Sequence, residues 1–128
     1  MAFAASAHAA APRIIEFSGQ PLAKPVRLTD WIENSTLSTL FRGAPPAAPR
    51  AERRRPFLKV SLYWGVTFTA QHGRFYPARP GRPALIDLPW AGAWPRLVPP
   101  SALHILRRHR VPTGVSPPDG GTLLVKPG

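Results

Sequence analysis

The chain contains no cysteine, one methionine and only six acidic residues in 128 positions. Without a thiol it forms no disulfide, and both thiolate catalysis and metal sites held by cysteine are excluded. The acidic residues are scattered and form no paired-carboxylate motif. His104 and His109 are five residues apart and do not share a helix face, so we expect no metal pair between them. These absences predict a protein with no cofactor and no metal site.

Long apolar runs and enzyme signatures are missing as well. No apolar stretch approaches the ~20 residues that a membrane-spanning helix requires. The N-terminal sequence MAFAASAHAAAPR lacks the basic and apolar regions of a signal peptide, so we expect a cytoplasmic protein with a flexible tail over residues 1–12. The sequence has no HExxH, P-loop, GxSxG or GxGxxG motif, which favours a protein that is not an enzyme.

Basic residues, in contrast, are abundant. Lysine and arginine together number 17, fourteen of them arginine, and the formal net charge is +11. An excess of this size attracts polyanions and indicates nucleic acid, or an anionic membrane surface, as a partner. A GC-rich gene would also enrich arginine, together with alanine, proline and glycine. Coding bias is therefore the alternative explanation of the charge.

Eighteen prolines and ten glycines divide the chain into segments. The stretch over residues 43–56, GAPPAAPRAERRRP, has the composition of a polyproline linker and ends in arginines. The part before it is short, so we expect that part to dock on the rest rather than to fold alone. The prediction is one small domain over residues 13–128 that contains this linker.

The strongest fold signal is the sequence FLKVSLYWGVTFT at residues 57–69, in which every second residue is apolar. A period of two over this length is typical of a strand with one face in a core. His72-Gly73 fits the centre of a two-residue hairpin turn. Such a turn places Ala70 opposite Phe75 and adds Phe75 to the apolar face. The sequence therefore predicts a long hairpin.

Helix signals flank this hairpin on both sides. Thr29 can cap a helix with acidic residues in its first turn, and Gly43 can end it. Ser101 can cap a second helix whose last turn is rich in arginine. The sequence thus predicts an α+β fold built on a small antiparallel sheet. The expected elements are a strand over 13–17, a long hairpin over 57–77, strands near 84–90 and 122–126, and helices over about 30–42 and 102–110.

The mixed face of the hairpin is the best candidate for function. Lys59, Tyr63, Arg74 and Tyr76 share it, with basic and aromatic side chains interleaved. Arginines can hold phosphates while rings stack on bases, as on sheets that bind single strands. A helix packed over this face would bury the tyrosines instead. The other arginines predicted to bind nucleic acid are Arg53, Arg54 and Arg55 in the linker, Arg79 and Arg82 in a loop, and Arg107 and Arg108 in the second helix.

Two other functions fit parts of the sequence. Trp90, Trp94 and the proline-rich loops could contact a protein partner, or a sheet edge could pair with another chain. A small toxin-like ribonuclease needs little more than a histidine, here His72 or His104, beside a cation that stabilises the phosphate. The main prediction is a non-enzymatic nucleic-acid-binding protein of low sequence specificity.

The C-terminal part carries one family resemblance. A helix after Pro100, a turn at Gly114-Val115 and the sequence GTLLVKP at 121–127 resemble the end of the swapped-hairpin AbrB/SymE-like proteins. The resemblance covers less than a third of the chain, and prolines stand where that family has a strand. It implies binding to DNA or toxin activity on RNA.

Overall fold

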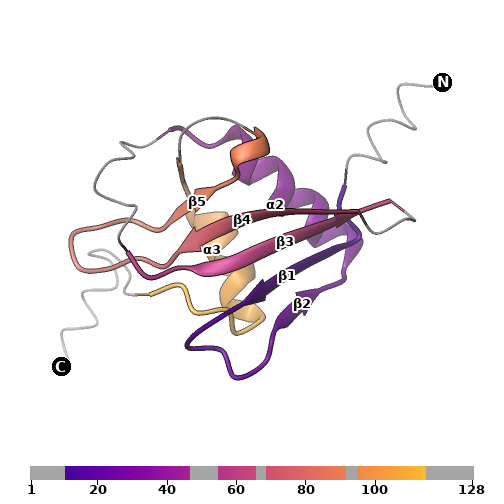
Figure 1. The fold of residues 1–128 in the computed structure, drawn as a ribbon. Helices are drawn as coiled ribbons and strands as arrows, with labels where there is room; N and C mark the ends of the chain where they lie inside the picture. Colours follow the sequence, from indigo (N-terminus) through magenta and orange to yellow (C-terminus); the bar gives the residue numbers. More distant parts are fainter. Residues whose placement is uncertain (1–10, 47–54, 66–68, 92–94, 115–128) are drawn as a thin grey trace.

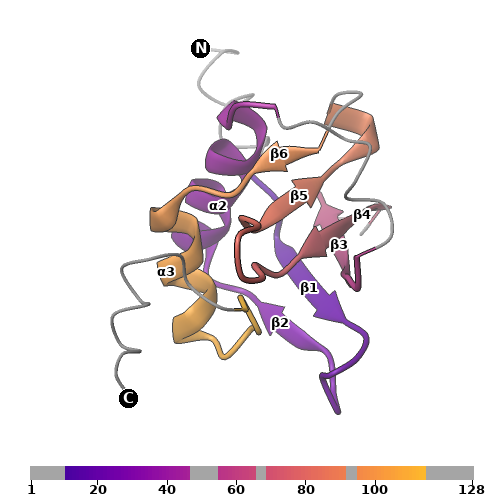
Figure 2. The same ribbon diagram turned by 90° about the vertical axis from the view of Figure 1, so that its left-hand side faces the viewer.

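The computed structural model describes residues 11–46, 55–65, 69–91 and 95–114. Six strands among them form one antiparallel sheet in the order β2-β1-β3-β4-β5-β6. Two α-helices lie together on one side of this sheet (Figure 1 and Figure 2). The predicted α+β fold on an antiparallel sheet is confirmed. The elements are β1 (Ile14–Ser18), β2 (Val26–Leu28), α2 (Trp31–Gly43), β3 (Leu58–Trp64), β4 (Thr69–Tyr76), β5 (Leu85–Asp87), the short 3-10 helix η2 (Pro89–Ala91), β6 (Arg96–Leu97) and α3 (Pro100–Arg108).

The core lies between the sheet and the two helices. Side chains alternate along a strand, and β3 turns Leu58, Val60 and Leu62 to the helix side, where all three are fully buried. Leu37 and Phe41 of α2 belong to the same apolar cluster. The apolar face predicted for the hairpin is therefore the inner face of the sheet.

The hairpin of β3 and β4 turns at a different place from the one that the sequence predicts. Phe75 pairs with Leu58 and not with Ala70. The connection begins at Gly65, which takes a left-handed φ of 64°, and the expected turn pair His72-Gly73 lies inside β4. The two registers differ by an even number of residues, so Lys59, Tyr63, Arg74 and Tyr76 keep their predicted face. Ala70 changes face, because it lies on β4 opposite Tyr63 and not opposite Phe75.

Gly73 is required by packing rather than by a turn. A Cβ atom at this position would lie 2.4 Å from the backbone oxygen of Asp87 and 2.8 Å from Cδ2 of Leu88. Only glycine allows the chain at the end of β5 to approach β4 this closely. Glycine is also frequent in tight turns. The sequence alone does not distinguish this use of glycine from close packing, so the predicted turn at His72-Gly73 was wrong.

Both helices lie close to their predicted positions, with different caps. Asp30, and not Thr29, caps α2, because the Asp30 carboxylate accepts a 2.9 Å hydrogen bond from the backbone N–H of Glu33. α3 begins at Pro100, before the expected cap Ser101, and has no side-chain cap. Proline is well tolerated there because it lacks an N–H that would need a partner.

The sequence pattern does not indicate the two edge strands. β2 and β6 follow Pro25 and Pro95 and are too short to show an alternation. A 2.9 Å backbone hydrogen bond from Leu97 to Pro45 joins β6 to the segment after α2. The beginning of the predicted linker therefore docks on the sheet. The expected strand at 122–126 lies outside the described residues.

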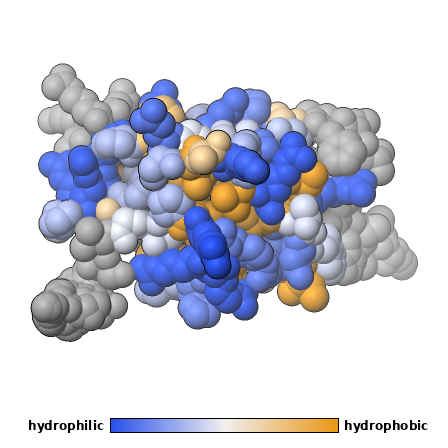
Figure 3. Space-filling view, turned by 90° about the horizontal axis from the view of Figure 1, so that it is seen from below, coloured by the Kyte–Doolittle hydropathy of each residue, from blue (hydrophilic) through white to orange (hydrophobic). Residues whose placement is uncertain are grey.

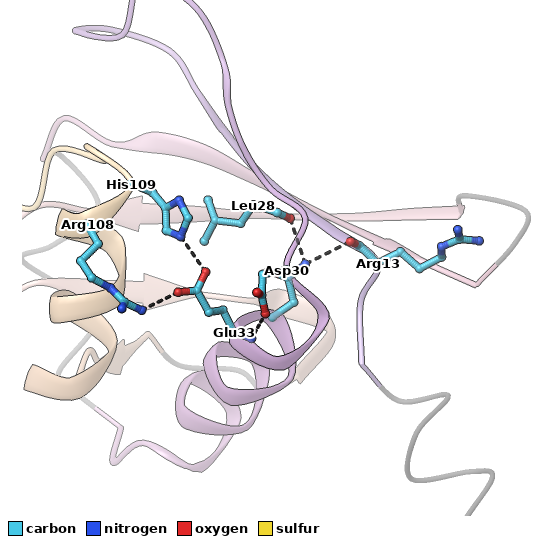
Figure 4. A network of polar contacts seen from close by, with 7 residues as sticks. Arg13, Leu28, Asp30, Glu33, Arg108 and His109 are labelled. Carbon is cyan, nitrogen blue, oxygen red and sulfur yellow. Dashed lines mark hydrogen bonds and ion pairs between the residues drawn. The ribbon is translucent and has the colours of Figure 1, made fainter.

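Polar contacts fix α2 between the sheet and α3 (Figure 4). The Asn34 side chain donates a 2.9 Å hydrogen bond to the backbone oxygen of Leu28 at the end of β2. Glu33 accepts a hydrogen bond from Arg108, and its other oxygen lies 2.6 Å from Nε2 of His109. These contacts hold both helices against the inner face and away from the outer face of the sheet.

Candidate nucleic-acid interface

The outer side of the sheet, here called the open face, carries two rows of polar side chains in cross-strand register. Figure 1 looks onto this face, with α3 passing behind the strands. The Lys59 row consists of Ser18, Lys59, Arg74 and Asp87 on β1, β3, β4 and β5. The His72 row consists of Arg27, Glu16, Ser61 and His72 on β2, β1, β3 and β4. The two rows are two residues apart along each strand, about 7 Å.

Two cationic side chains are cross-strand neighbours in the Lys59 row. Lys59 and Arg74 lie directly opposite each other, and both side chains are exposed. Neither forms an ion pair with another described residue, including the half-buried Asp87 beside Arg74. Like charges placed opposite each other on neighbouring strands are destabilising. The pair therefore favours an anion as its ligand.

An exposed aromatic ring lies next to this pair. The Arg74 guanidinium carbon is 4.3 Å from the centre of the Phe57 ring, and Phe57 is 40 % exposed. A ring beside cations is the combination that holds a base together with its phosphate. Phe57 is not among the residues predicted to bind nucleic acid, although its position alternates in phase with Lys59 and Tyr63.

Tyr63 lies on the open face, as the alternation predicts, and its hydroxyl is hydrogen-bonded to another side chain. The hydroxyl donates a 3.3 Å hydrogen bond to Oε1 of Glu16, and Arg27 Nε donates a 2.9 Å hydrogen bond to Oε2. The hydrogen bond and the charge of Glu16 raise the pKa of Arg27. The half-buried Tyr63 ring is only partly accessible to a ligand.

Tyr76 lies on the same face but is not accessible. It is 2 % exposed, and the Phe57 ring and the Arg55 guanidinium lie 5.9 Å and 5.8 Å from its ring. Arg55 is itself 4 % exposed and donates hydrogen bonds to the backbone oxygens of Pro77 and Pro83. A buried ring cannot stack on a base, and this guanidinium is committed to two carbonyls. The interface expected from the sequence therefore loses Tyr76 and Arg55.

Arg79 and Arg82 lie in the tight turn between β4 and β5, and both are exposed. Their backbones exchange two hydrogen bonds, of 2.9 Å and 2.7 Å, and Gly81 supplies the left-handed φ of 75° that the turn needs. The turn follows Tyr76 and so lies at the end of the sheet where Phe57 is found. These two arginines extend the basic surface at that end.

Two of the remaining predicted arginines, Arg107 and Arg108, are not brought to the open face. Arg107 and Arg108 lie in α3, on the inner side of the sheet. Arg107 donates a 2.9 Å hydrogen bond to the hydroxyl of Thr113, and Arg108 pairs with Glu33. Arg53 and Arg54 lie outside the described residues.

A cavity of about 460 Å³ lies at the opposite end of the open face. Its described lining consists of Arg13, Ile14, Thr29 and Trp31. Ile14 is the cross-strand partner of Tyr63, so the cavity lies beyond the His72 row. Its volume falls in the range of pockets for small ligands, roughly 300–1,000 Å³. An indole beside a guanidinium suits a nucleobase and its phosphate.

Trp90, which was expected to contact a partner, packs partly inside together with Trp64. Trp64 continues the inner face of β3, and its ring meets that of Trp90 edge-on at 6.0 Å. Both rings are half-buried and pack against the core. Trp94 lies outside the described residues.

Seen from the side of the β2 edge, apolar surface gathers in the middle and hydrophilic side chains surround it (Figure 3).

Within the described ranges no helix is long and apolar enough to cross a membrane. The same ranges contain no group of three side chains suited to hold a metal ion. No protein-family model, curated protein or solved structure matches the chain.

Proposed function

We propose that the protein binds single-stranded nucleic acid on its open face, with cations on the phosphates and Phe57 against a base. The observation that carries the proposal is the Arg74 guanidinium over the exposed Phe57 ring, directly beside Lys59. Rings stack on bases of any sequence, and cations follow the phosphate backbone. We therefore expect little sequence specificity.

An open sheet suits a single strand better than a duplex. Its side chains can meet the faces of unstacked bases, whereas duplex DNA is read by a helix or a narrow ribbon that enters a groove. Lys59 and Arg74 are one strand spacing apart, and Arg79 and Arg82 lie beyond Phe57. This arrangement provides cations on both sides of a stacked base. The net charge of +11 supports attraction of a polyanion over a longer range.

Fluorescence anisotropy with labelled single-stranded DNA and RNA, between about 50 and 200 mM salt, tests the proposal. We expect the affinity to fall steeply with salt, because each phosphate contact releases a counterion. The double variant Lys59→Gln/Arg74→Gln should weaken binding. It should also reduce the slope of log K against log salt by about 0.7 for each contact removed.

The matched control removes the same charge from the helix side. Arg42 in the last turn of α2 and Arg110 just after α3 are both exposed. Arg42→Gln/Arg110→Gln should change affinity only slightly and leave the salt slope unchanged. An equal loss in both double variants would show that net charge alone attracts nucleic acid. No binding by the unsubstituted protein at low salt would remove the proposal.

A further inference from the structure

The His72 row places a carboxylate and an imidazole on the same surface. Glu16 of β1 and His72 of β4 lie in one cross-strand line, with Ser61 of β3 between them. Neighbouring strands are about 4.8 Å apart, so the backbones of Glu16 and His72 are about 10 Å apart. This spacing leaves room for one phosphodiester group between the two side chains.

The imidazole is exposed and held by one contact. Ser61 Oγ lies 2.9 Å from Nδ1 of His72, and Ser61 is 3 % exposed, so the anchor belongs to the rigid sheet. Because Nδ1 is engaged, Nε2 is the nitrogen that can exchange a proton with a ligand. Ser61 thus acts as a positioning residue for the ring.

The carboxylate is held from two sides. Arg27 and Tyr63 each donate one hydrogen bond to it, and the Glu16 side chain keeps 13 % exposure on the open face. A carboxylate fixed in this way can accept a proton from a bound hydroxyl. The row therefore holds a proton acceptor and a proton donor on the two sides of Ser61.

We infer that the open face cleaves RNA by transphosphorylation, with Glu16 as general base and His72 as general acid. This inference rests on the proposed binding of nucleic acid at the same face. Glu16 takes the proton of a ribose 2′-hydroxyl, and that oxygen forms a bond to the adjacent phosphorus. The bond from phosphorus to the 5′-oxygen breaks, and protonated His72 gives its Nε2 proton to that oxygen. The products are a 2′,3′-cyclic phosphate and a 5′-hydroxyl, and no further reactant is consumed.

The cations needed by this reaction lie one row away. Lys59 is two residues from Ser61 on β3, and Arg74 is two residues from His72 on β4. Negative charge develops on the phosphate oxygens as the 2′-oxygen attacks, and fixed cations stabilise it. DNA lacks the 2′-hydroxyl, so the face should bind DNA without cleaving it.

The test uses the full chain and two labelled oligonucleotides of one sequence, one of RNA and one of 2′-O-methyl RNA. The second has no free 2′-hydroxyl and reports binding alone. We expect RNA fragments that end in a cyclic phosphate, detected by mass spectrometry. His72→Gln and Glu16→Gln should each lower the cleavage rate by about 100-fold or more and leave affinity for the 2′-O-methyl strand nearly unchanged. His104→Gln, at an exposed position of α3, is the matched control and should cleave normally.

The possible outcomes separate this inference from the proposed function. Binding of both oligonucleotides without cleavage overturns the inference and leaves the binding function standing. Binding of neither removes both. Cleavage that survives both His72→Gln and Glu16→Gln also overturns the inference, because other groups would then carry the reaction. His72 is exposed, so its variant should fold, and circular dichroism checks the Glu16 variant.

Discussion

The guanidinium carbon of Arg74 lies 4.3 Å from the centre of the Phe57 ring, which joins the residue before β3 to the neighbouring strand β4. Such a contact contributes about 0.5–1 kcal/mol at an exposed site, so it orients the two groups more than it stabilises the fold. Because Phe57 is 40 % exposed, part of its ring stays accessible. In the proposed binding mode, this ring and this cation contact the same nucleotide.

Replacing Phe57 by alanine should weaken binding of a single strand without unfolding the protein. Loss of one stacked base costs about 1–3 kcal/mol, on the order of 5- to 150-fold in affinity. Phe57→Tyr keeps the ring and should keep the affinity. Ile32→Ala removes a side chain that is 69 % exposed on the helix side and should have no effect. Anisotropy titrations at one salt concentration measure all three, and unchanged binding by Phe57→Ala would contradict the stacking role.

The faces of Lys59 and Arg74 could be predicted from the sequence, but the position of the turn and the face of Ala70 could not. Alternation assigns faces in any register that differs by an even number, so Lys59 and Arg74 were placed correctly on one side. Gly73, which the sequence predicts in the turn, lies inside β4, where the backbone of Asp87 approaches it closely. That approach is a contact between separate segments, and no local pattern reports it.

Accessibility on the open face could not be predicted either. Phe57, Tyr63 and Tyr76 are all predicted on one face of the hairpin, yet they are exposed, half-buried and buried. The difference arises at Tyr76 because Arg55 folds back over it to reach the carbonyls of a loop. The sequence predicts Arg55 as one of the linker arginines that bind nucleic acid, whereas its place in the structure depends on tertiary contacts. The acid, hydroxyl and imidazole of the His72 row come together only through strand pairing.

The cap of α2 offers a test of local structure. Asp30→Ala removes the hydrogen bond to the N–H of Glu33 and should lower the free energy of unfolding by about 0.5–2 kcal/mol. Thr29→Ala, at the position that the sequence favours as the cap, should have a smaller effect. Urea denaturation of the two variants decides between the caps, and a larger loss for Thr29→Ala would contradict the structure.

Two glycine-to-alanine substitutions, at Gly73 and at Gly43, test the packing role of Gly73. Gly73→Ala forces a methyl group to within 2.4 Å of the Asp87 oxygen, so β4 and the end of β5 must move apart. We expect a loss of about 1–3 kcal/mol in the free energy of unfolding. Gly43→Ala meets no atom within 4 Å and should be neutral or stabilising by up to about 1 kcal/mol. Thermal melts measure both, and a neutral Gly73→Ala would support the turn that the sequence predicts.

The contact of Arg108 with Glu33 predicts a role in stability rather than in binding. The two side chains are 54 % and 20 % exposed, so the pair should contribute roughly 0.2–1 kcal/mol. A double-mutant cycle with Glu33→Gln and Arg108→Gln should return a coupling energy in this range. Arg108→Gln should at the same time leave the salt slope of nucleic-acid binding unchanged, because the arginine lies on the helix side. If the coupling is zero and the slope falls, Arg108 contacts phosphate, and the interface must then include α3.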